Sequence, residues 1–235
     1  MTTNEQPLPS SYNSEGRIAD LGSSLAVVVT HPWGPLGGDY HNNVVRAVVA
    51  FFQQAGITTI RFNFRGSQIG FGSTQVNQVV EVCQQVLKGE GCTASGVAPK
   101  KLLLVGYSYG SLIATSASAD LADSVIATIS VAPPFGVQHW LLFFQSSYHT
   151  RRAAAVSAMP RLFVMGDHDN FTDVKTFQGA VERDFAATTN KESIIVKSAD
   201  HFFARREDAI IEVVGKWLLS TTQVESLRLL ARHYD

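Results

Sequence analysis

Short apolar segments alternate with longer segments of helical periodicity along most of the chain. The apolar segments are nearly continuous in Val, Ile, Leu and Phe, which is typical of strands covered on both faces of a sheet. We expect strands at Leu25–Thr30, Thr58–Phe62, Lys101–Gly106, Val125–Val131, Arg161–Gly166 and Glu192–Lys197. Helices are expected at Asn42–Ala55, Thr74–Lys88, Ser111–Ala119, Asp173–Ala187 and Arg206–Ser220. This alternation predicts an α/β fold, with a mostly parallel sheet and helices on both of its faces.

The two ends of the chain depart from this pattern. Residues 1–24 are rich in Pro, Ser, Asn and Gly and show little apolar periodicity, so we expect a flexible tail. Residues 25–220 are then one domain, in keeping with the total length of 235 residues. Residues 221–235 predict one more amphipathic helix, which packs back on the domain or forms a homodimer contact.

Composition and charge exclude several classes of function. The net charge is −1 and no basic patch is present to neutralise phosphates, so nucleic acid is not an expected partner. No apolar run is long enough for a membrane span, and Met1–Asp20 lacks the apolar core of a signal peptide. The two cysteines, Cys83 and Cys92, form neither a disulfide framework nor a metal-ligand pattern. We therefore expect a cytoplasmic protein whose cysteines bind no metal.

The segment Gly106–Gly110 has the pattern Gly-x-Ser-x-Gly, with Ser108 at its centre. An apolar strand precedes it and a helical pattern follows it, which is the context of the nucleophile elbow of α/β-hydrolases. The two glycines fit this role, because a Cβ atom two residues to either side of the serine would clash where strand and helix approach each other. Ser108 is therefore the predicted nucleophile.

A serine hydroxyl needs a base to remove its proton, and the base needs a carboxylate to orient it. In an open α/β sheet these groups come from loops at the carboxyl ends of strands, and in α/β-hydrolases the acid precedes the histidine. Two loops with suitable residues, Gly166–Phe171 and Ala199–Phe203, each follow a predicted strand. We expect Asp169 to be the acid and His201 the base.

Other acids and histidines are weaker candidates for these two roles. Asp167 is the alternative acid, whereas Asp200 is expected to order the turn beside His201. His168 precedes Asp169 rather than following it. Four further histidines lie before the predicted acid and are expected to make surface or loop hydrogen bonds: His31, His41, His139 and His149.

An oxyanion hole needs two backbone N–H groups directed at the developing negative charge. The residue after the nucleophile, Tyr109, is expected to supply one of them. The loop after the first strand of the domain, Thr30–Gly38, should supply the other. Pro32 has no N–H group, so Trp33 is the preferred donor and Gly34 the second choice.

The segment Pro133–Met159 joins two predicted strands and is too short for a large cap domain. It carries several aromatic residues, and we expect a short helix over Ser108 with Trp140 and Phe143 one turn apart on the same side. Together with Trp33, Tyr107 and Tyr109, these two residues would form an apolar pocket for an acyl group. The alternative is that half of these aromatic residues belong to the core.

Several ordered motifs resemble those of the small, uncapped α/β-hydrolases related to dienelactone hydrolases. The motifs are His31-Pro32 with Gly37-Gly38 and Asn42-Asn43-Val44-Val45, the segment Arg61–Gly66, the Ser108 pentapeptide and Ala199–Phe203, within about Leu25–Leu219. The resemblance implies a triad of Ser108, Asp169 and His201, and hydrolysis of esters or related acyl compounds without a cofactor. Dienelactone hydrolases proper use a cysteine nucleophile, whereas this chain has a serine.

The chain also departs from the pattern of this family. Trp33-Gly34-Pro35 stands where the family often has His-Pro, and the segment after Gly66 differs from the usual Val-Gly-x-Ser-x-Gly. That second segment borders the predicted site and leaves its specificity open. Arg61 and Arg65 fit either a substrate carboxylate or ion pairs that pin the loop to the sheet, and we favour the ion pairs.

These patterns predict a serine hydrolase that cleaves carboxylic ester or thioester bonds of small to medium acyl substrates through an acyl-enzyme. The expected partner is thus a small-molecule acyl substrate. Two alternatives stay open: a non-catalytic binding or scaffold protein on the same fold, and a hydrolase of small peptides or amides.

Overall fold

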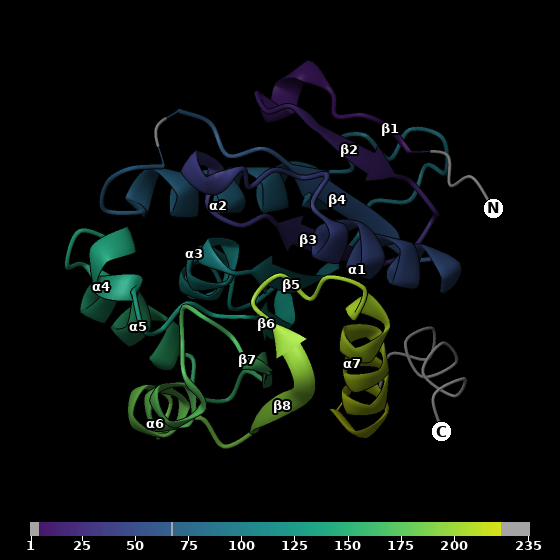
Figure 1. Ribbon diagram of the computed structural model, residues 1–235. Coiled ribbons are helices and arrows are strands. Elements are labelled where there is room, and N and C mark those ends of the chain that lie inside the picture. Colours follow the sequence, from purple (N-terminus) through teal and green to yellow (C-terminus); the bar gives the residue numbers. More distant parts are fainter. Residues whose placement is uncertain (1–4, 67, 222–235) are drawn as a thin grey trace.

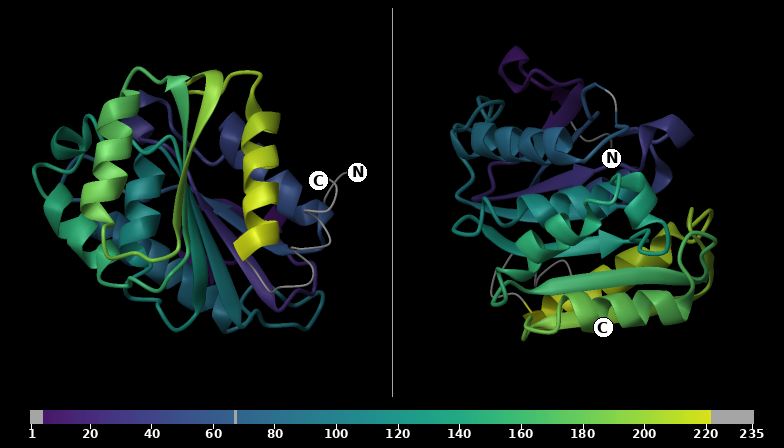
Figure 2. Two further views of the ribbon diagram at one scale, coloured as in Figure 1. Left: turned by 90° about the horizontal axis from the view of Figure 1, so that it is seen from below. Right: turned by 90° about the vertical axis from the view of Figure 1, so that its left-hand side faces the viewer.

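The computed structural model describes residues 5–66 and 68–221, and these residues form one eight-stranded sheet between two layers of helices (Figures 1 and 2). The strands are β1 (Gln6–Pro7), β2 (Gly16–Ala19), β3 (Leu25–Thr30), β4 (Thr58–Phe62), β5 (Lys101–Tyr107), β6 (Val125–Val131), β7 (Arg161–His168) and β8 (Lys191–Asp200). The helices are α1 (Asn43–Gln54), α2 (Ser73–Leu87), α3 (Tyr109–Ala117), α4 (Gln138–Leu141), α5 (Ser146–Ala154), α6 (Val174–Asp184) and α7 (Glu207–Thr221). Two 3₁₀ turns are also present, η1 (Ser10–Tyr12) and η2 (Gly34–Leu36).

The strand order is β1-β2-β4-β3-β5-β6-β7-β8, and all neighbours from β4 to β8 are parallel. The carboxyl ends of these six strands therefore share one edge of the sheet. The chain passes from β3 to β4 on one side and then crosses back to β5 on the other. Ligands of open α/β sheets bind at such a reversal of strand order. The predicted nucleophile lies at this point, because Ser108 directly follows β5.

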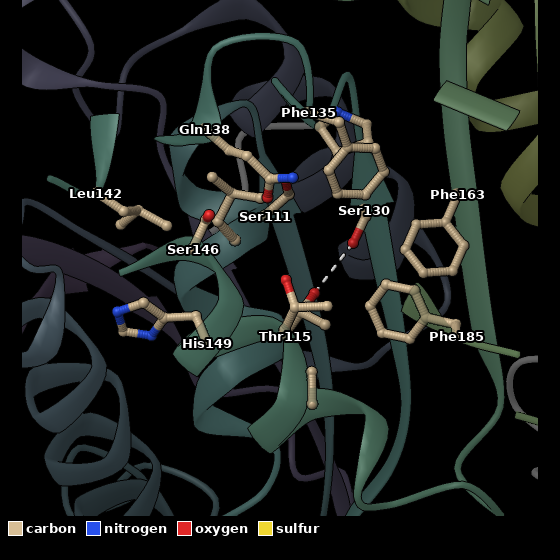
Figure 3. Close-up of a pocket in the computed structure, with 14 residues that line it drawn as sticks. Ser111, Thr115, Ser130, Phe135, Gln138, Leu142, Ser146, His149, Phe163 and Phe185 are labelled. Atoms are coloured by element: carbon tan, nitrogen blue, oxygen red, sulfur yellow. Dashed lines mark hydrogen bonds between the residues drawn. The ribbon is translucent and has the colours of Figure 1, made fainter. Parts of the chain in front are cut away.

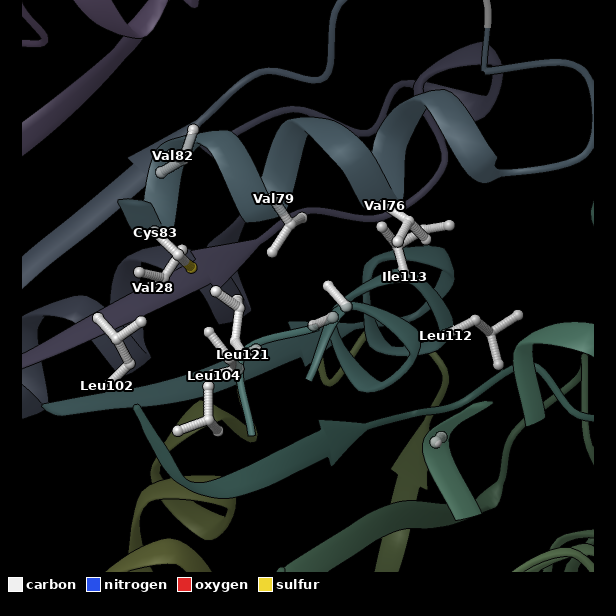
Figure 4. Packing of buried hydrophobic residues seen from close by; sticks show 14 of the residues in the cluster. Val28, Val76, Val79, Val82, Cys83, Leu102, Leu104, Leu112, Ile113 and Leu121 are labelled. Carbon is white, nitrogen blue, oxygen red and sulfur yellow. The ribbon is translucent and has the colours of Figure 1, made fainter. Parts of the chain in front are cut away.

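Each face of the sheet packs on its own set of helices, because side chains alternate along a strand. In β3, Ala26 and Val28 belong to the core on the side of α2, α3 and α6, while Val27 and Val29 belong to the core on the side of α1 and α7. Figure 2 shows these two layers on either side of the twisted sheet. Figure 4 shows one side of α2 directed at the sheet, with Val79 above β3. The predicted parallel α/β architecture is thus confirmed.

The expectation that residues 1–24 form a flexible tail is wrong for the described part of that segment. β2 pairs antiparallel with β4 in the register Ile18↔Ile60, and β1 pairs with β2. Tyr12 is buried and donates from its hydroxyl to the carbonyl oxygen of Glu90 at 2.7 Å. The segment has few large apolar residues, so no periodicity marked it. Its order comes from the free edge of β4, which supplies backbone partners.

The segment between β6 and β7 carries only the two short helices α4 and α5 in the described chain, and no large cap covers the sheet. Strands β7 and β8 extend to His168 and Asp200, so the two loops with the predicted acid and base are shorter than expected. The predicted helix at residues 221–235 lies outside the described residues, apart from Thr221 at the end of α7.

Candidate active site

Ser108 occupies a strained turn between β5 and α3, with φ 53° and ψ −124°. A Cβ atom on Gly106 would lie 2.4 Å from the Cα atom of Ser111. A Cβ atom on Gly110 would lie 2.5 Å from the carbonyl oxygen of His31. Only glycine fits at these two approaches, as the Gly-x-Ser-x-Gly pattern predicted. The N–H of Ser108 donates to the carbonyl oxygen of Val131 at 2.8 Å, which anchors the turn to β6.

The structure brings together three of the predicted residues in one chain of hydrogen bonds. The Oγ atom of Ser108 lies 2.9 Å from Nε2 of His201, and Nδ1 of His201 lies 2.7 Å from Oδ2 of Asp169. All three residues are buried. In this order the imidazole can take the hydroxyl proton at Nε2 while the carboxylate orients Nδ1–H, which is the arrangement of a catalytic triad.

Hydrogen bonds distinguish Asp169, which contacts His201, from the neighbouring acids Asp167 and Asp200. The Oδ1 atom of Asp169 accepts hydrogen bonds from the N–H groups of Phe171 at 2.8 Å and Thr172 at 3.0 Å, which leaves Oδ2 for the imidazole. Asp167 instead accepts the N–H of Ser198 at 2.7 Å and so joins β7 to β8. Asp200 accepts the N–H of Phe202 at 3.1 Å, as expected of a residue that orders its turn.

The position of His201 depends on two neighbouring aromatic residues. The hydroxyl of Tyr107 donates to the carbonyl oxygen of His201 at 3.1 Å and holds its backbone against β5. The ring of Phe171 lies 4.4 Å from the imidazole, measured between ring centroids. Burial raises the pKa of Tyr107 above its usual range, so this hydroxyl stays a donor at all working pH values.

The two predicted oxyanion donors lie on opposite sides of the serine in the sequence. Tyr109 begins α3, and the first N–H groups of a helix have no acceptor within the helix. The second choice in the other loop, Gly34, is already engaged, because its N–H donates to Oε1 of Gln68 at 2.8 Å. Gln68 also accepts the indole N–H of Trp33 on its backbone oxygen at 2.9 Å. These contacts favour the backbone N–H of Trp33 as the second donor.

His31 fixes the orientation of the peptide that carries this N–H group. The Nε2 atom of His31 accepts the N–H of Phe64 at 3.0 Å, so the proton of the neutral ring is on Nδ1. Nδ1 lies 2.6 Å from the carbonyl oxygen of Pro32 and donates to it. In a trans peptide the N–H points opposite to the C=O, and the N–H of Trp33 therefore points away from His31. Burial lowers the pKa of His31 to about 4 and keeps the ring neutral.

An apolar pocket of about 130 Å³ opens beside Ser108 and His201. Trp33, Tyr107 and Trp140 line it as predicted, and the indole ring of Trp140 meets that of Trp33 edge-on at 5.3 Å. The remaining lining residues are mainly apolar: Pro32, Leu36, Gly38, Asn42, Pro134, Val137, Leu141, Phe171 and Phe202. The pocket thus suits an uncharged group of about the size of a benzene ring.

Two aromatic residues predicted to form this pocket do not line it. Helix α4 ends at Leu141, and Phe143 has φ 44°, so Trp140 and Phe143 do not share one side of a helix. The side chain of Tyr109 is fully buried, with its ring 6.0 Å from that of Phe64, and only its backbone borders the site. The physical reason for the first error is the early end of α4, which the run of apolar residues concealed.

A second cavity lies behind α4, between α3, α5, β6 and β7 (Figure 3). Phe135, Phe163 and Phe185 form its apolar wall, and the side chain of Gln138 points into it. Thr115 and Ser130 bond to each other across its floor at 3.1 Å. Its volume of about 20 Å³ suits a water molecule and not an acyl group. It does not border Ser108, so a group that reacts with Ser108 would have to enter the pocket of about 130 Å³ instead.

Arg61 and Arg65 are both engaged in ion pairs, as we favoured. Arg61 contacts the carboxylate of Glu5 and donates to the carbonyl oxygen of Tyr40 at 2.9 Å, so it ties β4 to neighbouring segments. Arg65 contacts the carboxylate of Glu81 on α2. Neither arginine lines the active-site pocket.

Sequence reasoning missed the roles of His31 and Gln68. The motif His31-Pro32 was visible, but the partner of the imidazole, Phe64, is 33 residues away. Gln68 lies in the segment after Gly66, where the chain differs from the family that it resembles, and no local sequence pattern indicates its role. Among residues 5–66 and 68–221 no group of His, Cys, Asp and Glu side chains could hold a metal ion, and no helix is both long and apolar enough to span a bilayer.

Comparisons with known proteins agree with the fold. The model of a family described as the alpha/beta hydrolase family matches residues 27–231. An alpha-beta serine hydrolase homologue from Coxiella burnetii is 23% identical, with a TM-score of 0.68 over 100% of this chain and 99% of that chain. A serine hydrolase without lid from Xanthomonas campestris is 21% identical, with a TM-score of 0.70 over 94% and 95% of the two chains.

A more distant structure and a sequence relative extend these comparisons. An esterase from Pyrococcus furiosus is 15% identical, with a TM-score of 0.68 over 93% of this chain and 90% of that chain. A protein of Rickettsia prowazekii is 24% identical over 214 residues, which is 88% of this chain and 84% of the relative. At these identities the likeness to solved structures shows the fold alone.

Proposed function

The chain belongs to the alpha/beta hydrolase family, and we propose that it is a serine hydrolase of carboxylic esters or thioesters with small to medium acyl groups. The observation that carries this proposal is the buried hydrogen-bond chain from Asp169 through His201 to Ser108, which ends beside an apolar pocket. A carbonyl carbon placed in that pocket would lie next to the serine hydroxyl and the two candidate oxyanion donors.

The proposed reaction proceeds in two steps. Oγ of Ser108 attacks the acyl carbon as its proton passes to Nε2 of His201, and the carbonyl electrons collect on the oxygen that the N–H groups of Trp33 and Tyr109 bind. The C–O or C–S bond of the substrate then breaks, and His201 returns the proton to the leaving alcohol or thiol. Water attacks the acyl-enzyme in the same way, which releases the acid and restores Ser108.

Two further observations bear on the substrate and the location of the protein. Among the described residues that line the pocket, none outside the triad has a charged side chain, which favours an uncharged acyl group over a charged peptide or a phosphate. The thiols of Cys83 and Cys92 are unpaired and buried, and burial raises the pKa of Cys92 to about 11. Unpaired thiols fit the reducing environment of the cytoplasm, which we include in the proposal.

Labelling with a fluorophosphonate probe, followed by intact-mass measurement, tests this function. We expect one adduct on the wild type, none on Ser108→Ala and slow labelling of His201→Ala. The exposed Ser147 provides a control, because Ser147→Ala should label like the wild type. Turnover of a short-chain ester should fall by roughly 10³-fold or more in Ser108→Ala. A Ser108→Ala protein with the wild-type rate, or a folded wild type that takes no label, would instead favour a binding protein on this fold.

A further inference from the structure

Besides Phe202, which lines the active-site pocket and is 53% exposed, four aromatic residues on or near α4 expose their rings to solvent. Phe71 is 59% exposed, Trp140 64%, Phe143 46% and Phe144 80%. Phe71 comes from the loop before α2, Trp140 from α4, and Phe143 and Phe144 from the segment that joins α4 to α5, and we call these four residues the aromatic shelf. Exposed apolar groups of this size on one side of a molecule commonly mark a binding surface.

The shelf is continuous with the pocket. Trp140 belongs to both, because it lines the pocket and contacts Trp33 at its edge. The N–H of Phe143 donates to the carbonyl oxygen of Trp140 at 3.3 Å, so these two residues are linked through one turn. The ring of Phe143 then meets that of Phe71 edge-on at 6.3 Å. A chain leaving the pocket past Trp140 would thus meet the rings of Phe143 and Phe71, and Phe144 is the next residue along the chain.

The backbone angles at two shelf positions are unfavourable for phenylalanine. Phe143 has φ 44° and Phe144 has φ 64°, and both values lie in the left-handed region that bulky side chains rarely adopt. Glycine or asparagine would fit there with less strain. Two phenylalanines therefore accept strain while their rings gain little packing in the folded chain. Because the strained backbone of Phe143 and Phe144 is not offset by packing of their rings, it points to a role of these rings in binding.

A buried histidine holds the loop of Phe71 against the rest of the shelf. One ring nitrogen of His149, Nε2, lies 2.6 Å from the carbonyl oxygen of Phe71 and donates to it. The other, Nδ1, accepts the hydroxyl of Ser116 on α3 at 2.9 Å. His149 is buried, and burial lowers its pKa, so the neutral form with these two bonds is favoured. The loop is therefore attached to α5 and α3 before any ligand arrives.

The size of the pocket limits how much of a substrate it can hold. A volume of about 130 Å³ accepts a group near the size of a benzene ring, and a longer acyl chain must continue outside. The leaving group departs toward His201, which is followed directly by Phe202. Phe202 packs against Phe171 at 6.3 Å, whereas Trp140 packs against Trp33 at 5.3 Å, so the two rings belong to different parts of the pocket wall. The shelf is therefore placed for the acyl part rather than the alcohol part.

We infer that the aromatic shelf binds the distal part of an apolar acyl chain whose ester or thioester carbonyl lies at Ser108. This inference rests on the proposed hydrolase function and specifies its substrate class: uncharged substrates with a medium-length acyl chain, for which the chain beyond the pocket lies on Phe71, Trp140, Phe143 and Phe144. When the acyl chain lies on these rings, apolar surface of both the chain and the rings is removed from water, and this burial provides the affinity.

The test compares p-nitrophenyl acetate, butyrate and decanoate, each below its critical micelle concentration. The variants are Phe144→Asn and the double variant Phe143→Asn/Phe144→Asn, because asparagine fits the left-handed backbone. The control is Val97→Asn, which changes an exposed apolar residue that lines none of the pockets beside Ser108. We expect the decanoate-to-acetate ratio of kcat/KM to fall about tenfold in the double variant and to be unchanged in the control.

A binding measurement separates failure of this inference from failure of the proposed function. Calorimetry on Ser108→Ala should show that this variant binds p-nitrophenyl decanoate. We expect the Kd of this ester to rise about tenfold when the shelf substitutions are added, and the Kd of p-nitrophenyl butyrate to stay unchanged. If the wild type hydrolyses no ester but the binding of p-nitrophenyl decanoate depends on the shelf residues, the proposed hydrolase function is wrong, whereas binding of an acyl chain by the shelf is supported. If hydrolysis occurs but the ratio is unaltered by the shelf variants, the shelf inference is wrong.

Two other outcomes would also overturn it. If a series of acetates with lengthening alcohol chains shows the effect instead, the shelf binds the leaving group. If sedimentation shows that the shelf substitutions convert a dimer into a monomer, the shelf is a contact between two copies of this chain. An unchanged sedimentation coefficient and an unchanged alcohol series are the results that we expect.

Discussion

The Nδ1 atom of His31 lies 2.6 Å from the carbonyl oxygen of Pro32, the residue that follows it. This short contact directs the next peptide, because the N–H of Trp33 must point opposite to the Pro32 carbonyl. The other ring nitrogen of His31, Nε2, accepts the N–H of Phe64, so the imidazole is neutral and has one defined tautomer. The oxyanion loop thus depends on a histidine that does not contact the proposed reacting atoms.

Titration of His31 should make the protein less stable in mild acid. Its pKa is lowered from 6.5 to about 4 by burial, so the unfolded chain binds the proton more readily than the folded one. The stability contribution is complete above pH 6.5 and is lost as the pH falls toward 4, by about 3 kcal/mol in total. Urea unfolding of the wild type and of His31→Gln at several pH values measures the difference. Equal pH slopes for the two proteins would contradict this account.

Removing the acceptor on Gln68 should lower the rate of the chemical step. In Gln68→Met the N–H of Gly34 loses its partner, and the peptide beside the proposed donor Trp33 is no longer held. We expect kcat for a short-chain ester to fall by roughly 10- to 100-fold while KM changes little. Gln68→Glu retains an oxygen at the same distance along the side chain and should recover most of the rate at neutral pH. Equal kinetics for Met and Glu would show that the contact only packs the loop.

Replacing Asp169 by asparagine should nearly abolish turnover without unfolding the protein. The amide oxygen can still accept the N–H groups of Phe171 and Thr172, so the loop should keep its shape. It cannot hold Nδ1–H of His201 in the same way, and kcat should fall by about 10³- to 10⁴-fold. Asp167→Asn is the matched control two residues away, since Asp167 bonds to Ser198 instead. A larger loss in the control would assign the acid to Asp167.

The close approach of strand and helix at the elbow can be tested through stability. In Gly110→Ala the new Cβ atom would lie 2.5 Å from the carbonyl oxygen of His31, so backbone must move, and we expect a loss of about 3 kcal/mol. Gly179 on α6 has open space around its Cβ position, and Gly179→Ala should gain about 1 kcal/mol. Thermal unfolding of both variants checks the contrast. Similar shifts for both would mean that the elbow has room for a side chain.

The order and the type of most elements were predictable from the sequence. The strand predicted at Leu25–Thr30 matches β3 residue for residue, because a strand covered on both faces must be apolar along its whole length. The loops with Asp169 and His201 were predictable for a related reason. Parallel strands end at one edge, so polar residues just after strand ends in different parts of the chain come together there.

The errors arose where local pattern and tertiary contact disagree. The segment with Tyr12 and Ile18 looked like a tail, because its order depends on pairing with β4 more than forty residues later. Phe143 looked like a pocket residue, because an apolar run does not show where a short helix ends. The predicted helix at residues 221–235 stays a prediction.

The sequence by itself determined the parallel α/β architecture, the position of the elbow and the identity of the residues that meet beside it. These features follow from periodicity, from glycine spacing and from the order of strand ends, all of which are local or topological. Only the tertiary structure decided that Gln68 occupies the N–H of Gly34, that His31 directs the peptide of Trp33, and that Phe143 lies outside the pocket. Those outcomes depend on atoms from distant segments meeting within hydrogen-bond or van der Waals distance, which no local pattern encodes.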